Sequence, residues 1–166
     1  YNVQTVIVSP FIEELFKDIP ILITFLLGKK TFEEMLSYSL IVGVVFGFVE
    51  NCYVILVNID SVEYIDALVR TFGAGLLHSI CCLIFLLVIY FFSSRKSVVF
   101  IIFVSLVVNF LACSVHSIFN TFMNFGFEIV GYLLIYVIGL LCIVGFIRYQ
   151  RKIYSDKCKR IERVLD

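Results

Sequence analysis

The sequence predicts an all-α protein, a polytopic membrane helix bundle of about five transmembrane helices. Of its 166 residues, 61% are apolar and only 16% are charged, whereas a soluble domain has about 45–50% apolar and about 25% charged residues. The mean hydropathy is +1.06, so the chain is expected to lie in a lipid bilayer. The 13 basic and 13 acidic residues cancel, so no polyanionic partner is implied. The composition therefore excludes a water-soluble enzyme, a nucleic-acid binder and a disordered chain.

Apolar runs between polar connections mark the expected helices. The first run contains two prolines and four charged residues, and we expect Asp18 to cap a helix that resumes at Pro20. The second carries Gly43 and Gly47 on one face, which lets a neighbouring helix approach closely. The remaining three are almost purely apolar. The expected helices span about 3–27, 32–57, 67–92, 98–123 and 129–147.

The connections between these runs alternate in charge, which predicts the orientation. Lys and Arg occur between runs one and two, between runs three and four, and after run five, whereas the other two connections are acidic. By the positive-inside rule, the C-terminus is cytoplasmic and the N-terminus faces outward. We therefore divide the chain into a transmembrane domain, 1–147, and a basic cytoplasmic tail, 148–166. Because the chain begins at Tyr1 rather than Met, we expect it to be part of a longer protein.

Ionisable residues inside the predicted spans lie at one depth. At a rise of about 1.5 Å per residue, the acids and histidines of four spans lie about 10 to 17 Å from the outer end of their helix. Such residues are costly in a membrane and usually face a cavity with a function. Among their neighbours, Asn109 is expected to make an interhelical hydrogen bond, and Arg70 to snorkel or to pair with Asp66. The layer contains Glu13, Glu14, Lys17, Glu50, His78 and His116, beside Asn51 and Asn120.

The ordered set of polar motifs resembles a known family. Glu13-Glu14-Leu-Phe-Lys17 is similar to the Glu-Glu-x-x-Lys motif of the PrsW family of intramembrane proteases, and Phe46-Gly-Phe-Val-Glu50-Asn51 to its Phe-x-x-x-Glu-Asn segment. His78 and His116-Ser-Ile-Phe-Asn120 follow in the family's order. The related prenyl endopeptidase and bacteriocin-immunity group has Arg one residue later than Lys17 and His in place of Glu50, so the resemblance is closer to PrsW.

This resemblance implies an endopeptidase of the bacterial plasma membrane that cuts membrane-anchored proteins near the extracytoplasmic side. The best-known role of the family is site-1 cleavage of an anti-sigma factor. Peptide hydrolysis needs a base, an oxyanion stabiliser and a proton donor. We expect Glu13 or Glu14 to be the base, tuned by Lys17, with Glu50 and His78 orienting the water or taking part in proton transfer. We expect His116 and Asn120 to stabilise the oxyanion, with Asn51 and Arg70 in support.

Two points stay open at this stage. No cofactor is required by the residues themselves, but Glu50, His78 and His116 form an alternative zinc site, since two histidines and a carboxylate are a known catalytic set. A proton- or ion-coupled transporter, or a non-catalytic immunity or scaffold protein, would also use buried polar residues. The oligomeric state is left open by the sequence.

Overall fold

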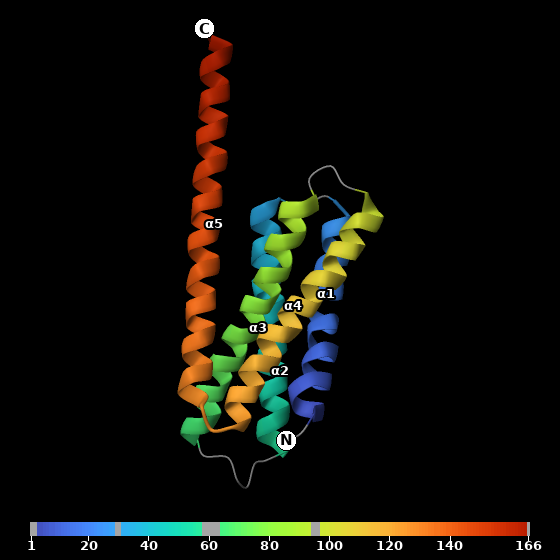
Figure 1. Cartoon of the computed structure of the whole chain (residues 1–166), viewed down its shortest axis with the longest axis vertical. Coiled ribbons are helices and arrows are strands. Elements are labelled where there is room, and N and C mark those ends of the chain that lie inside the picture. The colour runs from blue at the N-terminus through green and yellow to red at the C-terminus, as the bar shows by residue number, and fades with distance from the viewer. Residues whose placement is uncertain (1–2, 29–30, 58–63, 94–96, 166) are drawn as a thin grey trace.

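A computed structural model describes residues 3–28, 31–57, 64–93 and 97–165, with the side chains of 64–70, 93, 150 and 152–165 left out. The predicted all-helical class is confirmed, because these ranges are almost entirely helical and contain no strand. The elements are a π-helix η1 and five α-helices, of which the last extends well past its predicted end (Figure 1). Their bounds are η1 Gln4–Val8, α1 Ser9–Leu26, α2 Phe32–Val57, α3 Tyr64–Ser93, α4 Val98–Asn124 and α5 Glu128–Leu165.

Four of the described helices are long and apolar enough to cross a membrane: α2, α4, the Thr71–Phe92 part of α3 and the Glu128–Tyr149 part of α5. These make the chain a multi-pass membrane protein. Helix α1 is the exception, because its 18 residues include two glutamates, a lysine and an aspartate. It nevertheless lies alongside α4 in the bundle (Figure 1). That α1 also crosses the bilayer stays a prediction.

The orientation also stays a prediction. The basic connections at Lys29, Lys30, Arg95 and Lys96, and the acidic one at Asp60 and Glu63, lie outside the described residues. The predicted tail continues α5 as one helix to Leu165, so no break in the helix separates the two predicted domains.

Helix α3 is the centre of the bundle. Within its span, 56% of the residues are buried, against 11% in α5. One apolar cluster, which includes Ile21, Met35 and Phe85, fills the half of the bundle that holds the end of α3. A second cluster, around Leu77 and Phe119, packs α3 against α4 and α5. Because α3 contacts all the other α-helices, its polar residues are held from every side.

Helices α2 and α3 meet along a seam of small residues, as the sequence predicts. A Cβ atom added at Gly43 would lie 2.5 Å from the Cα atom of Ser79, and one at Gly47 would lie 2.8 Å from the Cα atom of Gly75. Such distances leave no room for any side chain at either glycine. The close approach brings Glu50 of α2, one turn beyond Gly47, within reach of His78 of α3.

The start of α1 is shaped by Pro10. In η1 the amide of Ser9 donates to the carbonyl of Gln4, five residues back. The next carbonyl, that of Thr5, would need an N–H at position 10, which proline lacks. The side-chain amide of Asn120 in α4 donates to it instead, at 3.0 Å. The hydrogen bond that Pro10 cannot donate to Thr5 is thus replaced by one from Asn120 of α4.

The expectation that Asp18 caps a new helix at Pro20 is wrong. Helix α1 continues through Pro20 to Leu26, since a membrane helix tolerates proline when its neighbours supply packing and hydrogen bonds. The side chain of Asp18 is buried and accepts a 2.9 Å hydrogen bond from Nδ2 of Asn109 in α4. Asn109 therefore makes the interhelical hydrogen bond that was expected of it.

Candidate active site

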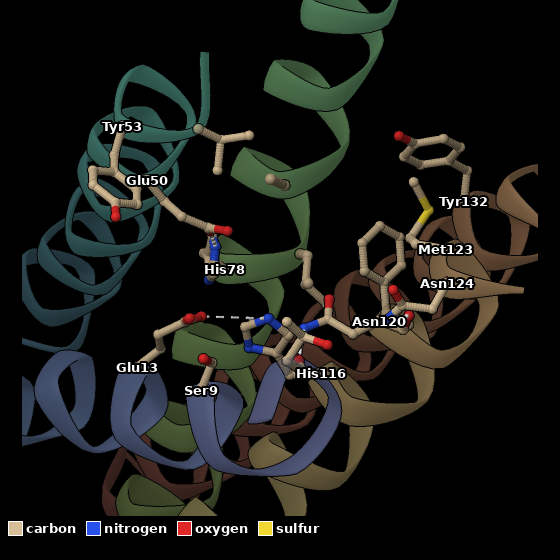
Figure 2. A pocket seen from close by; sticks show the side chains of 15 residues that line it. Ser9, Glu13, Glu50, Tyr53, His78, His116, Asn120, Met123, Asn124 and Tyr132 are labelled. Atoms are coloured by element: carbon tan, nitrogen blue, oxygen red, sulfur yellow. Dashed lines mark hydrogen bonds and ion pairs between the residues drawn. The ribbon is translucent and has the colours of Figure 1, made fainter. Parts of the chain in front are cut away.

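A cavity of about 360 Å³ opens at the end of the bundle where α2 and α4 end and α5 begins. This is the end that holds the N-terminus and is opposite to the C-terminus (Figure 1). Its walls are apolar and aromatic, and its polar side chains converge from several helices (Figure 2). Among the residues that line it are Glu13, Glu50, His78, His116 and Asn120. The structure thus brings together residues that the sequence could only place at one depth.

Glu14 and Lys17 form an ion pair behind this cavity. Nζ of Lys17 donates to Oε1 of Glu14 at 2.6 Å, and both side chains are fully buried. The same Nζ atom lies 5.0 Å from the ring centroid of Phe46 in α2, a cation–π contact. Neither member of the pair lines the cavity. Of the two adjacent glutamates, Lys17 therefore pairs with Glu14, and Glu13 is the one that faces the cavity.

His78 connects this ion pair with α2. Its Nδ1 atom lies 2.5 Å from Nζ of Lys17, and its Nε2 atom lies 2.6 Å from Oε2 of Glu50. The ring is fully buried, whereas the side chain of Glu50 is 24% exposed, toward the cavity. The rings of Phe46 and His78 also meet edge to face, with centroids 5.2 Å apart. Both ring nitrogens of His78 are therefore engaged.

His116 connects the ion pair with Glu13. Its Nδ1 atom lies 2.6 Å from Oε1 of Glu14, and its Nε2 atom lies 3.5 Å from Oε2 of Glu13. The rings of His78 and His116 meet edge to face, with centroids 5.1 Å apart. The contacts thus run without a break from Glu50 through the buried pair to Glu13. Only the two ends of this chain are carboxylates that face the cavity.

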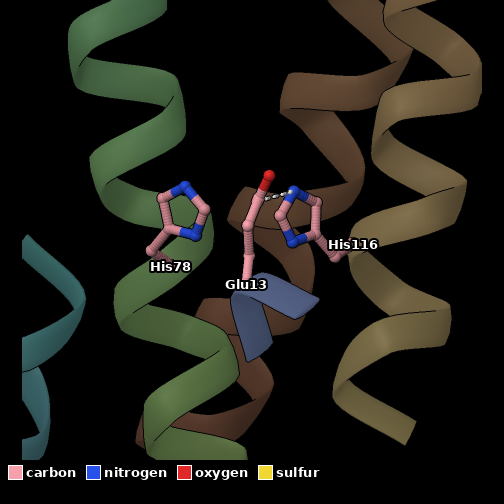
Figure 3. Close-up of side chains that lie close together, drawn as sticks. All are labelled: Glu13, His78 and His116. Atoms are coloured by element: carbon pink, nitrogen blue, oxygen red, sulfur yellow. Dashed lines mark ion pairs between the residues drawn. The ribbon is translucent and has the colours of Figure 1, made fainter. Parts of the chain in front are cut away.

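Three of these residues could hold a metal ion. Ligand atoms of Glu13, His78 and His116 all lie within 4.8 Å of one another, with Glu13 between the two imidazoles (Figure 3). Oε2 of Glu13 is buried and has no hydrogen-bond partner, so this oxygen is available as a ligand for a cation. His116 contacts Glu14 with its other nitrogen, an arrangement typical of zinc-binding histidines. Glu13 and His116 therefore fit a zinc ion.

The metal set predicted from the sequence differs from this cluster in one residue. It contained Glu50 where the structure places Glu13. Glu50 instead lies in direct hydrogen-bond contact with Nε2 of His78. Both histidines are common to the two sets.

The remaining predicted site residues, Asn51, Asn120 and Arg70, differ in their positions. Asn51 is buried and donates to the carbonyl of Gly47 in its own helix, at 2.8 Å. Asn120 lines the cavity and holds η1 through Thr5. The side chain of Arg70 lies outside the described residues.

Sequence reasoning missed the aromatic wall of the cavity. Tyr53 and Tyr132 line it from α2 and α5, and the Tyr132 ring packs edge to face on Phe119. A signal existed in Gly73, because a Cβ atom there would collide with the Tyr132 ring. This glycine therefore makes room for an aromatic ring of α5.

Comparison with known proteins gives one finding. A family model described as "PrsW family intramembrane metalloprotease" matches residues 1–147. No curated protein and no solved structure matches the chain.

Proposed function

From the premise that this chain belongs to the PrsW family of intramembrane metalloproteases, we propose that its cavity is the active site of an endopeptidase. The substrate is a membrane-anchored protein, cut near the extracytoplasmic side. One observation carries the proposal: Glu13, His78 and His116 converge from three different helices on one cavity. A convergence of a carboxylate with two imidazoles in an apolar setting is typical of hydrolytic sites.

Glu13 is the general base in this scheme. Its side chain is 21% exposed and lines the cavity, so it can accept a proton from a water molecule there. Glu14 is not the base in this scheme, because it is fully buried and contacts Lys17 and His116 instead. A base must lie within hydrogen-bond reach of the proton that it removes.

The leaving amine needs a proton, and Glu50 with His78 can supply it. Their hydrogen bond is 2.6 Å long, and Glu50 opens on the cavity. Asn120 has a second amide hydrogen beyond the one given to Thr5, which makes it a donor for the developing oxyanion. Glu13 and His116, with His78 within reach, would alternatively hold a zinc ion, which would polarise the scissile carbonyl and a water molecule, and Glu13 would then act as a ligand in place of the general base.

The proposed location follows from the predicted orientation. The cavity lies at the end opposite to the C-terminal part of α5 (Figure 1), which positive-inside counting assigns to the cytoplasm. The cleaved bond would then be extracytoplasmic, in the bacterial plasma membrane, and an anti-sigma factor is a substrate of suitable topology. A transporter is disfavoured, because the apolar cluster of Ile21, Met35 and Phe85 closes the other half of the bundle.

The test is proteolysis by the purified full chain in liposomes. The probes are fluorescence-quenched peptides that consist of an apolar membrane helix of about 20 residues and a varied outer segment, with products identified by mass spectrometry. We expect cleavage that is lost in Glu13→Gln and kept in Glu33→Gln, a matched change at an exposed glutamate on α2. Unchanged cleavage by Glu13→Gln would refute the assignment of the base.

Metal dependence is tested with the same assay. We expect a strong chelator to abolish cleavage and added zinc to restore it, because Glu13 and His116 fit a cation. Cleavage that survives stringent chelation, in protein shown by elemental analysis to be metal-free, would leave a glutamate-dependent mechanism without metal.

A further inference from the structure

The buried pair of Glu14 and Lys17 contacts both histidines but does not touch the cavity. Oε1 of Glu14 lies 2.6 Å from Nδ1 of His116, and Nζ of Lys17 lies 2.5 Å from Nδ1 of His78. The two contacts have nearly the same length, but Glu14 accepts a hydrogen bond from its histidine whereas Lys17 donates one. A carboxylate can only accept hydrogen bonds, whereas an ammonium group can only donate them.

These rules determine where each imidazole carries its proton. Because Lys17 donates to Nδ1 of His78, that nitrogen has a lone pair, and the proton of the neutral ring is on Nε2, where it is donated to Glu50. Because Glu14 accepts from Nδ1 of His116, the proton of that ring is on Nδ1. Its Nε2 atom stays 3.5 Å from Oε2 of Glu13, which has no hydrogen-bond partner. In a neutral ring whose proton is on Nδ1, the Nε2 atom carries a lone pair.

We infer that Glu14 and Lys17 are positioning residues that hold the two histidines in opposite tautomers. Toward the cavity, His116 then presents a lone pair and His78 presents an N–H group. A lone pair serves as a base or a metal ligand, whereas an N–H group serves as a hydrogen-bond donor. His116 therefore acts together with Glu13, and His78 acts together with Glu50.

This assignment changes how the cluster of Glu13, His78 and His116 can be used. A metal ligand must be an unprotonated nitrogen, and His78 has no such atom free while Lys17 and Glu50 hold it. His78 therefore acts as a donor and not as a ligand. It also corrects the expected role of His116, which as a lone-pair bearer cannot donate to an oxyanion. The tautomers are inferred from contacts alone, and only their catalytic use rests on the proposed protease function.

The experiment is nitrogen NMR of the full chain in detergent, with ¹⁵N-labelled histidine. The chain has only two histidines, so a His116→Gln variant assigns both rings in two-bond proton–nitrogen correlation spectra. In metal-free protein we expect His116 to show a protonated Nδ1 and His78 a protonated Nε2. The same tautomer in both rings, or a doubly protonated ring, would overturn the inference.

Zinc alone is the second probe. On addition of zinc we expect the Nε2 resonance of His116 to shift, while Nε2 of His78 keeps its proton. Zinc-bound shifts in both rings would overturn the assignment of His78 as a donor. Neither spectrum needs a substrate, so a failure of the protease proposal would leave these results unaffected, and a wrong tautomer would leave the cleavage assay unaffected.

Variants separate positioning from structure. Lys17→Met removes the donor to Nδ1 of His78 but leaves Glu50 to accept from Nε2, so we expect the Nδ1 resonance of His78 to shift and the fraction of the Nε2-protonated tautomer to fall. Lys17→Arg keeps a donor and should retain the wild-type spectrum. An unchanged His78 spectrum in Lys17→Met would overturn the role of Lys17. If this variant does not fold, the wild-type spectrum still decides the question.

Discussion

The seam between α2 and α3 gives the sharpest prediction, for Gly43→Ala. The new Cβ atom would lie 2.5 Å from Cα of Ser79, 2.6 Å from its nitrogen and 2.8 Å from the carbonyl carbon of His78. All three are backbone atoms, so no side chain can rotate away. Because favourable carbon contacts begin at about 3.5 Å, the two helices must separate by about 1 Å.

This separation should break the contact between Glu50 and His78. Their hydrogen bond is 2.6 Å long, and a further 1 Å takes it beyond the range of about 2.7–3.2 Å in which such bonds form. Misplacement of a reacting group by about 1 Å can cost about 100-fold in rate. We expect a loss of that order in cleavage. We also expect a loss of about 1–3 kcal/mol in the free energy of unfolding from overpacking, partly offset by the better helix propensity of alanine.

The assay is cleavage of the quenched peptides in liposomes, with thermal unfolding of the same preparations. Gly145→Ala in α5 is the matched control, because its Cβ atom would meet nothing within 4 Å while the gain in helix propensity is the same. Wild-type cleavage by Gly43→Ala would refute the reasoning, since the seam would then not determine the position of Glu50.

The remaining predictions concern the buried contacts and the orientation. Glu14→Gln leaves the ammonium of Lys17 buried without its partner, so a thermal melt should show a loss of about 3–5 kcal/mol, whereas Glu13→Gln should melt near wild type; equal melts would contradict this. Asn109→Leu removes the donor to Asp18 and should cost about 1–3 kcal/mol, a figure that chemical denaturation in detergent can check and that an unchanged midpoint would contradict. Green fluorescent protein fused at the C-terminus should fluoresce in bacterial cells, and a dark but fully expressed fusion would reverse the predicted orientation.

The bounds of α2, α3 and α4 could be predicted from the sequence because a clear change in polarity lies at the ends of their apolar runs. Helix α2 has the predicted bounds, Phe32 to Val57. Where the prediction failed, the competing physics is local. Pro20 was read as a helix start, but α1 continues through it, since in a bundle neighbouring helices compensate for the lost N–H group. The predicted end of α5 followed the end of the apolar run, whereas its helix continues to Leu165.

The candidate site could be predicted as a set of residues but not as a set of pairs. A rise of about 1.5 Å per residue gives depth, and depth placed Glu50, His78 and His116 in one layer. It does not say which face of each helix turns inward. The adjacent glutamates show this most clearly, because one faces the cavity and the other lies behind it with Lys17. Only the positions of α3 and α4 around α1 decide between them.

The position of the polar residues inside the cavity has a consequence for what can be read as a cleavage signal. In an α-helix each backbone carbonyl is hydrogen-bonded within the helix and surrounded by side chains, whereas a scissile carbonyl must come within hydrogen-bond reach of the groups that line the cavity, such as Glu13 and Asn120. Under the proposed function, the scissile bond is therefore presented by an extended stretch of chain. Selection among membrane proteins then depends on how readily a segment unwinds as much as on its side chains. A substrate with glycine, proline or asparagine beside its membrane anchor would be cleaved readily, whereas one with a continuous leucine-rich helix there would be cleaved poorly.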